Sequence, residues 1–462
     1  MTSNDPALPG GDLPTLYPPD VPLAVPVDPP PAPLPSGFPL QPGFWAAILW
    51  CVGMLLLTQV PGGVVSIALM LVLLFALPGQ PDVTQISDPG ELLGSTAGQM
   101  AVGAGLGVAH LLMIGLSLVV LRIVVGQDWR REVAVRRPTW SQALLVAASA
   151  PAFVVVANVT YRYVQNGLQF PGVNDLPAAA CFLTSVVGTV AAAGVVSFVL
   201  WLVLGRHWGR RLSGNGAPVR STLLTAAALA GVVGCGVTLY RFALPTFRDL
   251  LPAGAAMANM EEMEGLFSGW PVAVAVLFVA VLPALSEELW CRAFVGRGLI
   301  GLHGLFWGVL LTSFLFGVIH VDPCQGTMAM VLGVFLHVVY LLTRSLWMPM
   351  LLHFLNNAMA VTLPRLPAVQ ELETIDPRYG AVILAAACVV LAVVGVALVR
   401  CRARLVTPAG EPEWTPPHRG VVCPPAGSAT QVVSPALTLP MAALVLIALA
   451  GLAGAVALPL MR

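Results

Sequence analysis

The sequence predicts an all-α fold, a polytopic transmembrane helix bundle of about 11 spans that follows a proline-rich, disordered N-terminal tail. Three observations support this prediction: 57% of the 462 residues are hydrophobic, only 10% are charged, and long apolar runs recur along the chain. An ordinary soluble domain carries about 25% charged residues. The formal net charge is zero, so the composition indicates no nucleic-acid partner, and the lipid bilayer is the first partner that we expect.

The N-terminal tail, residues 1–43, contains fourteen prolines and four aspartates but no arginine. Proline lacks a backbone N–H, and at this density it favours extended polyproline segments over helices. We therefore expect this tail to be disordered. A second proline-rich loop is expected at 405–434.

Eleven segments satisfy the requirement of about 20 apolar residues for a spanning helix. They are 44–77, 98–123, 141–164, 178–204, 220–244, 270–292, 299–320, 327–345, 346–363, 379–400 and 435–458. The first segment is long and carries Pro61 near its middle, so it is either one kinked, tilted helix or a hairpin.

Arginine placement predicts how these segments alternate across the membrane. The chain has no lysine, and its arginines cluster in the loops 122–137, 206–220 and 400–419. By the positive-inside rule these three loops are cytoplasmic. Strict alternation through all eleven segments then follows if 44–77 crosses once, which also puts the N-terminus in the cytoplasm.

Charged residues inside the spans are few, and three of them lie close together in LSEELWCRAF, residues 285–294. A charge near the centre of a bilayer costs about 2.5–3.5 kcal/mol on insertion scales, so such residues are rare and usually functional. Glu288 and Arg292 are spaced i, i+4 and are expected to pair on one helix face. Glu287 lies about 100° further round the helix and is free to face another helix.

Two later histidines are candidate partners for Glu287. If the chain turns at about 300–302, Glu287 and His320 lie roughly 20 Å and 27 Å from that turn along adjacent antiparallel helices, so modest tilt brings them to one depth. Together they are able to activate a water molecule for attack on a carbonyl group. His353 and Asn357, again spaced i, i+4, would stabilise the oxyanion that forms.

The three segments that carry these residues resemble the motifs of one family. EELWCR is similar to the EExxxR motif, FGVIH to FxxxH and HFLNN to HxxxN of the CPBP family, which contains the CAAX prenyl endopeptidases and the related bacteriocin-processing and immunity proteins. Each motif alone is weak evidence, but the three in this order on predicted spans are specific. The resemblance covers about 100 residues, from 270 to 363.

The resemblance implies an intramembrane endopeptidase, with a protein or peptide at the membrane as its substrate. It assigns water activation to Glu287, with His320 assisting, and a supporting role to Glu288 and Arg292. The third motif would supply the oxyanion-stabilising pair. The breadth of the family allows a bacterial source, so we expect a multi-pass protein of a bacterial cytoplasmic membrane.

The predicted domains follow from the tail, the spans and the motif region. After the tail come N-terminal transmembrane helices at 44–264 and a CAAX-protease-like catalytic domain at 265–365. Residues 366–462 supply further transmembrane helices around the second proline-rich loop.

Metal binding at this site is an alternative. Glu287, His320 and His353 would supply three zinc ligands and leave a position for water. The HExxH signature of many zinc proteases is absent, and the eight cysteines are scattered without a CxxC pair. We therefore favour metal-independent glutamate chemistry, with a divalent metal such as zinc as the alternative cofactor.

Two other functions compete with the protease. One is a non-catalytic membrane scaffold or immunity protein that keeps the motifs for binding a partner. The other is an ion-coupled transporter that uses the buried charges as a relay, although the sequence shows no repeats typical of such proteins. His337 matches no motif, and we expect it to be structural.

Overall fold

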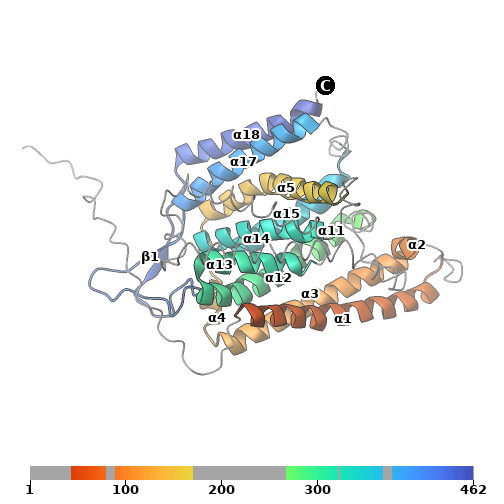
Figure 1. Ribbon diagram of the computed structural model, residues 1–462, viewed down its shortest axis with the longest axis horizontal. Helices are drawn as coiled ribbons and strands as arrows, with labels where there is room; N and C mark the ends of the chain where they lie inside the picture. The colour runs from red at the N-terminus through yellow and green to blue at the C-terminus, as the bar shows by residue number, and fades with distance from the viewer. Residues whose placement is uncertain (1–42, 80–88, 170–266, 321–322, 368–376, 461–462) are drawn as a thin grey trace, which may run out of the picture. The chain divides into compact units, whose positions relative to one another are not determined.

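The computed structural model describes residues 43–79, 89–169, 267–320, 323–367 and 377–460, which are coloured in Figure 1. Side chains are described for most of these residues and not for a few at helix ends. Residues 1–42 of the predicted tail lie outside the described residues, as do the predicted spans 178–204 and 220–244.

Helices make up about 78% of the described chain. The N-terminal elements are α1 (Phe44–Ala76), α2 (Pro89–Gly94), α3 (Thr96–Val124), α4 (Trp129–Glu132) and α5 (Trp140–Gln169). The central elements are α11 (Val272–Ala275), the π-helix η1 (Val276–Val281), α12 (Leu282–Glu288), the π-helix η2 (Leu289–Gly296), α13 (Arg297–Val318), α14 (Pro323–Thr343), α15 (Trp347–Thr362) and the short 3-10 helix η3 (Leu363–Arg365). The C-terminal elements are α17 (Pro377–Arg400), the strands β1 (Arg404–Val406) and β2 (Gln431–Val433), and α18 (Leu439–Leu460).

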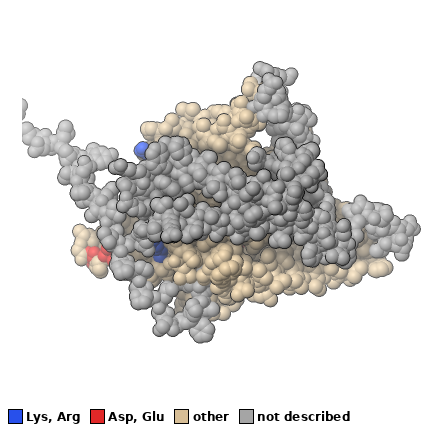
Figure 2. Space-filling model, in the orientation of Figure 1, with Lys and Arg blue, Asp and Glu red and all other residues tan. Residues whose placement is uncertain are grey.

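The predicted helical membrane bundle is confirmed. Within the described ranges, seven helical stretches are long and apolar enough to cross a membrane. The part of the surface that Figure 2 colours shows very few charged side chains, as a lipid-facing surface requires. The predicted span 346–363 corresponds to α15, whose 16 residues are fewer than the usual 20 or so for a spanning helix.

Segment 44–77 forms one helix, α1, and not the hairpin that the sequence left as an alternative. Pro61 lies inside the helix. At Gly62 the backbone approaches α3 so closely that a Cβ atom would lie 2.7 Å from the carbonyl oxygen of Gly105. Ser66 Oγ also donates a hydrogen bond of 2.9 Å to the Ala101 carbonyl. Small residues of this kind let membrane helices pack backbone to backbone.

The turn between the two helices that carry the first two motifs is at Gly304, slightly later than the predicted 300–302. Gly304 has φ 78° and ψ 175°, a conformation that only glycine adopts readily. After this residue the chain folds back, and Gly308 packs directly against the backbone of Ile300. The backbone therefore reverses at this glycine without a longer polar loop.

One end of the helices is joined by arginine side chains. Arg297 forms an ion pair with Glu132, and Arg136 Nε donates a hydrogen bond of 2.7 Å to the Arg344 carbonyl. Ser345 Oγ donates to the Arg136 carbonyl in return, at 2.7 Å. These contacts bring the loop after α3, the start of α13 and the loop after α14 to the same end, as the predicted alternation requires.

The C-terminal hairpin loop, residues 401–438, packs on this same end. Gln142 Nε2 donates a hydrogen bond of 3.0 Å to the Cys401 carbonyl, and Arg344 donates to the carbonyl of Val422. Burial, with a smaller contribution from the charge of Arg297, lowers the pKa of His418 to about 4. The imidazole is therefore neutral near pH 7. That these loops face the cytoplasm stays a prediction.

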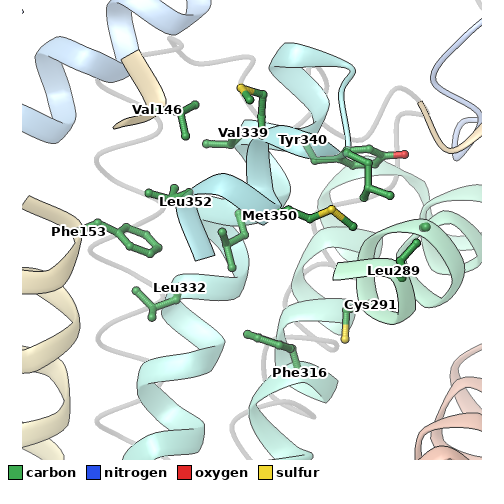
Figure 3. Packing of buried hydrophobic residues seen from close by; sticks show 14 of the residues in the cluster. Val146, Phe153, Leu289, Cys291, Phe316, Leu332, Val339, Tyr340, Met350 and Leu352 are labelled. Carbon is green, nitrogen blue, oxygen red and sulfur yellow. The ribbon is translucent and has the colours of Figure 1, made fainter. Parts of the chain in front are cut away.

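One hydrophobic cluster of buried residues holds the central helices together. It includes Trp290 of η2, Phe316 of α13 and Phe153 of α5, and Figure 3 shows part of it. The Phe153 ring makes an edge contact with Phe335, with ring centroids 5.6 Å apart. Aromatic contacts of this kind add about 0.5–1.5 kcal/mol to the burial of their surface. The motif-bearing helices are thus held in a packed core.

We expect Gly304→Ala to lower the free energy of unfolding by about 1–3 kcal/mol, because alanine is strained at a positive φ with an extended ψ. Thermal or denaturant unfolding in detergent measures this loss. Gly115→Ala is the matched control, since Gly115 lies in α3 with no atom within 4 Å of an added Cβ. Equal stability of the two variants would contradict the assigned turn.

Candidate active site

The first motif lies on a short α-helix between two π-helical segments. α12 is seven residues long, with η1 before it and η2 after it. π-Helical turns are rare and are found frequently at functional sites. Pro283 in α12 has no N–H, so it cannot donate the bond that a regular helix would give to the Val279 carbonyl. Asn357 Nδ2 donates to that carbonyl instead, at 3.0 Å.

Glu288 and Arg292 form the predicted ion pair on one helix face. Arg292 Nη1 donates a hydrogen bond of 2.8 Å to Glu288 Oε1, and the two side chains are 1% and 0% exposed. Arg292 Nη2 also donates to the Gly333 carbonyl, at 3.3 Å. The guanidinium carbon lies 4.4 Å from the centroid of the Phe316 ring. The arginine, on η2, therefore contacts three other helices: α12, α14 and α13.

Glu288 has a second partner that spacing along the sequence did not predict. His353 Nδ1 donates a hydrogen bond of 2.9 Å to Glu288 Oε1, the oxygen that also accepts from Arg292. A carboxylate bonded to one ring nitrogen fixes both the orientation and the tautomer of a histidine. As a result, the other nitrogen of His353, Nε2, points toward Glu287, 3.8 Å from Glu287 Oε2.

His320 faces Glu287 in a similar way from the end of α13. Its Nδ1 donates a hydrogen bond of 2.7 Å to the Phe316 carbonyl, one helical turn earlier. Its ring packs edge-on against the Phe316 ring, with centroids 5.0 Å apart. His320 Nε2 is then 4.0 Å from Glu287 Oε2, so the two residues meet at one depth as helix geometry predicts.

Glu287 lies between the two imidazoles, and its side chain is 15% exposed. Its Oε2 atom is buried and makes no hydrogen bond to any residue that the structure describes. A buried carboxylate oxygen without a partner is costly, whereas a water molecule bonded to it would satisfy it. The gaps of 3.8 and 4.0 Å to the histidine nitrogens exceed a direct hydrogen bond, and a bridging water is able to close them.

Asn357 differs from its expected arrangement. The sequence predicts that Asn357 and His353 present their polar groups to one spot, but the Asn357 side chain bonds to Val279 and accepts a hydrogen bond of 3.0 Å from Asn356 Nδ2. Pro283 is the physical reason, because it leaves the Val279 carbonyl in need of a donor. An asparagine amide has two N–H groups, so one remains after the bond to Val279.

Sequence reasoning assigned no role to three residues of this site. Phe316 contacts His320, His353 and Arg292, and it is the first residue of the motif FGVIH, whose phenylalanine was assigned no role from the sequence. Ser286 is fully buried, and His110 of α3 contacts it. His110 lies in an apolar run without a motif, so a lone polar residue was its only signal.

His337 lies on α14, fully buried. Its ring packs beside Gly296, where an added Cβ atom would lie 3.2 Å from His337 Nε2. Neither ring nitrogen has a hydrogen-bond partner in the part of the chain that the structure describes. The predicted structural role of His337 stays a prediction.

The three alternative zinc ligands are spaced more widely than tetrahedral zinc requires. Tetrahedral zinc ligands lie about 2.0–2.2 Å from the metal and so about 3.3–3.6 Å from one another. The nitrogens of His353 and His320 are 3.8 and 4.0 Å from Glu287 Oε2. Among the described residues, no three His, Cys, Asp or Glu side chains are arranged to hold a metal ion. In this arrangement the three atoms are about 0.2–0.7 Å further apart than tetrahedral zinc ligands would be, and metal-independent chemistry stays a prediction.

Fold and site together define a polytopic helical membrane protein with a carboxylate–histidine cluster buried among its helices. Residues 269–359 match the family model described as type II CAAX prenyl endopeptidase Rce1-like, so this part of the chain is similar to that family. The match includes all three motifs and supports an intramembrane CAAX-type protease at the family level. A search of curated proteins and a search of solved structures each find no match.

We expect Arg292→Ala to lower the free energy of unfolding by about 3–5 kcal/mol, because it leaves the Glu288 carboxylate buried without its cation. Unfolding in detergent, followed by circular dichroism, measures the loss. Arg400→Ala is the control, since Arg400 is exposed at the end of α17 and its removal should change stability by less than about 0.5 kcal/mol. A double variant, Glu288→Met with Arg292→Met, should be less destabilised than Arg292→Ala; a larger loss would contradict the pairing.

Proposed function

We propose that this protein is an intramembrane endopeptidase that hydrolyses a peptide bond of a membrane-associated protein or peptide by glutamate-activated water. The observation that carries this proposal is the placement of Glu287 between His320 and His353. The Nδ1 atom of His320 donates a hydrogen bond to the Phe316 carbonyl, and that of His353 donates to Glu288 Oε1. The Nε2 atom of each ring faces Glu287 Oε2. The family of residues 269–359 supports the same reaction class.

In the proposed reaction Glu287 is the general base. A water molecule bonded to Glu287 Oε2 and His320 Nε2 transfers a proton to the carboxylate as its oxygen attacks the substrate carbonyl carbon. This forms a C–O bond and places a negative charge on the carbonyl oxygen. When the intermediate collapses, the C–N bond breaks, and the proton on Glu287 passes to the leaving amine.

The other motif residues support this step. His353 Nε2, when protonated, and the remaining amide N–H of Asn357 are the candidate donors to the oxyanion; each well-placed donor is worth a few kcal/mol. Glu288 and Arg292 would hold these groups in position. Glu287 would thus act as the general base, and Glu288 would hold the neighbouring side chains in position. The two adjacent carboxylates are therefore not interchangeable.

An apolar cavity lies beside α12, the helix that carries Glu287. It has a volume of about 400 Å³ and lies between α12 and α15, lined by residues that include Leu285, Met350, Leu351 and Phe354. Leu285 and Glu287 are two residues apart on α12 and so point about 200° apart around the helix axis, and the residues that line the cavity do not include Glu287, His320 or His353. A lipid-modified or strongly apolar substrate suits this lining.

We expect Glu287→Ala to abolish cleavage while the protein remains inserted in the membrane, since loss of a general base reduces the rate by about 10²–10⁴-fold. Comparative proteomics of wild-type cells and cells carrying Glu287→Ala measures this effect as membrane-protein fragments that disappear. Arg400→Ala provides a matched control with fragments unchanged.

Three outcomes would contradict the protease. Fragments that persist in the Glu287→Ala strain would exclude glutamate-activated hydrolysis. A cellular phenotype that survives Glu287→Gln and His320→Ala together would favour a membrane scaffold or immunity protein. Proton-coupled uptake into proteoliposomes that is lost with the same substitutions would favour a transporter.

We expect cleavage to continue in the presence of a divalent-metal chelator, because the proposed reaction uses only protein groups and water. The measurement is the rate of fragment formation by purified protein in lipid vesicles, with and without chelator, together with its metal content by mass spectrometry. Loss of activity in chelator, and its recovery with added zinc, would assign Glu287, His320 and His353 to a metal site instead.

A further inference from the structure

A histidine from outside the matched domain reaches the candidate site. His110 lies on α3, and its Nδ1 is 2.9 Å from Ser286 Oγ, the side chain immediately before Glu287. His110 is partly buried and lies close enough to Glu287 and His353 to interact electrostatically with both. The N-terminal helices therefore supply a polar group to a site that residues 269–359 otherwise build.

Close packing of α3 fixes where His110 lies. At Gly107, one turn before His110, an added Cβ atom would lie 2.8 Å from the Phe278 ring of η1. At Gly103, a further turn back, it would lie 3.3 Å from the Trp270 ring. Glycine at both positions lets α3 approach these aromatic rings. The imidazole of His110 is thus set against α12 by backbone packing.

One arrangement of the hydrogen bonds at this contact, in which His110 donates, gives both residues a partner. Ser286 Oγ is 3.3 Å from the Pro283 carbonyl, which only accepts, so the serine hydroxyl donates there. The hydroxyl oxygen then accepts from His110 Nδ1–H. Ser286 is 0% exposed, and losing either partner would leave a buried polar group with fewer bonds.

α12 needs such a contact more than an ordinary helix does. It is seven residues long, is flanked by the π-helical segments η1 and η2, and contains Pro283, which cannot donate a helix hydrogen bond. Its rotation about its own axis therefore depends on contacts from other helices. On one side His353 bonds to Glu288, and on another His110 bonds to Ser286. Glu287 lies between these two anchored residues.

We propose that His110 is a positioning residue, which holds α12 through Ser286 so that the Glu287 carboxylate faces His320 and His353. This inference rests on the proposed function. It assigns no contact with substrate to His110. It makes α3, a helix outside the family domain, part of the apparatus that orients the base.

The test compares three substitutions of His110 in cells. The readout is the rate at which the Glu287-dependent fragments form, measured by pulse–chase and normalised to the amount of protein in the membrane. His110→Ala should reduce this rate about tenfold, because a small misplacement of a reacting group lowers the rate by 10–100-fold. His110→Asn should restore it to within about threefold, since its amide N–H occupies the position of Nδ1. His110→Gln, with its amide one carbon further out, should restore little.

A double-variant cycle tests the path through Ser286. If His110 acts through this hydroxyl, Ser286→Ala should reduce the rate of fragment formation to a similar degree. The rate of the combined variant should then be at least about half that of either single variant. Full additivity of the two losses would overturn the proposal. So would an Asn variant as slow as the Ala variant, or an Ala variant within twofold of wild type.

Two parallel variants separate this proposal from the function on which it rests. His303→Ala is the matched histidine control, because His303 is exposed beside the Gly304 turn, and its rate should match wild type. Fragments that persist in Glu287→Ala would overturn the proposed function itself. Fragments that vanish in Glu287→Ala and persist unchanged in His110→Ala would overturn only the role of His110.

Discussion

The buried pair of Glu288 and Arg292 is the interaction on which the rest of the candidate site depends. Each charge alone would be costly in the interior of a membrane protein. The paired side chains also form contacts with several other helices. Arg292 extends to the Gly333 carbonyl and to Phe316, whereas Glu288 extends to His353. A neutral pair would fill the same space without orienting these partners, so the charges are best understood as fixing geometry.

The sequence predicted those parts of the site that follow from spacing along one helix or one hairpin. The i, i+4 spacing predicted the bond between Glu288 and Arg292, and the helix rise predicted that Glu287 and His320 meet at one depth. The helical membrane bundle followed from the apolar runs. These features depend on local geometry, which the order of residues determines directly.

Spacing along one helix or one hairpin could not predict contacts between helices that are distant in the chain. The bond from His353 to Glu288 and the contact of His110 with Ser286 join segments 65 and 176 residues apart, and no periodicity encodes them. Asn357 was expected at the oxyanion because only its own helix was considered. Its bond to Val279 depends on Pro283, in another helix, which deprives that carbonyl of its usual donor.

The single-residue turn at Gly304 has a consequence for how the charged helix enters the bilayer. With no polar loop between them, α12 to α13 form a helical hairpin that is suited to partition into lipid in one event during synthesis. Glu288 would enter already neutralised by Arg292 on the adjacent turn, and Glu287 would arrive beside His320. The polar groups would then be screened from hydrocarbon by their own hairpin before the other helices assemble around it.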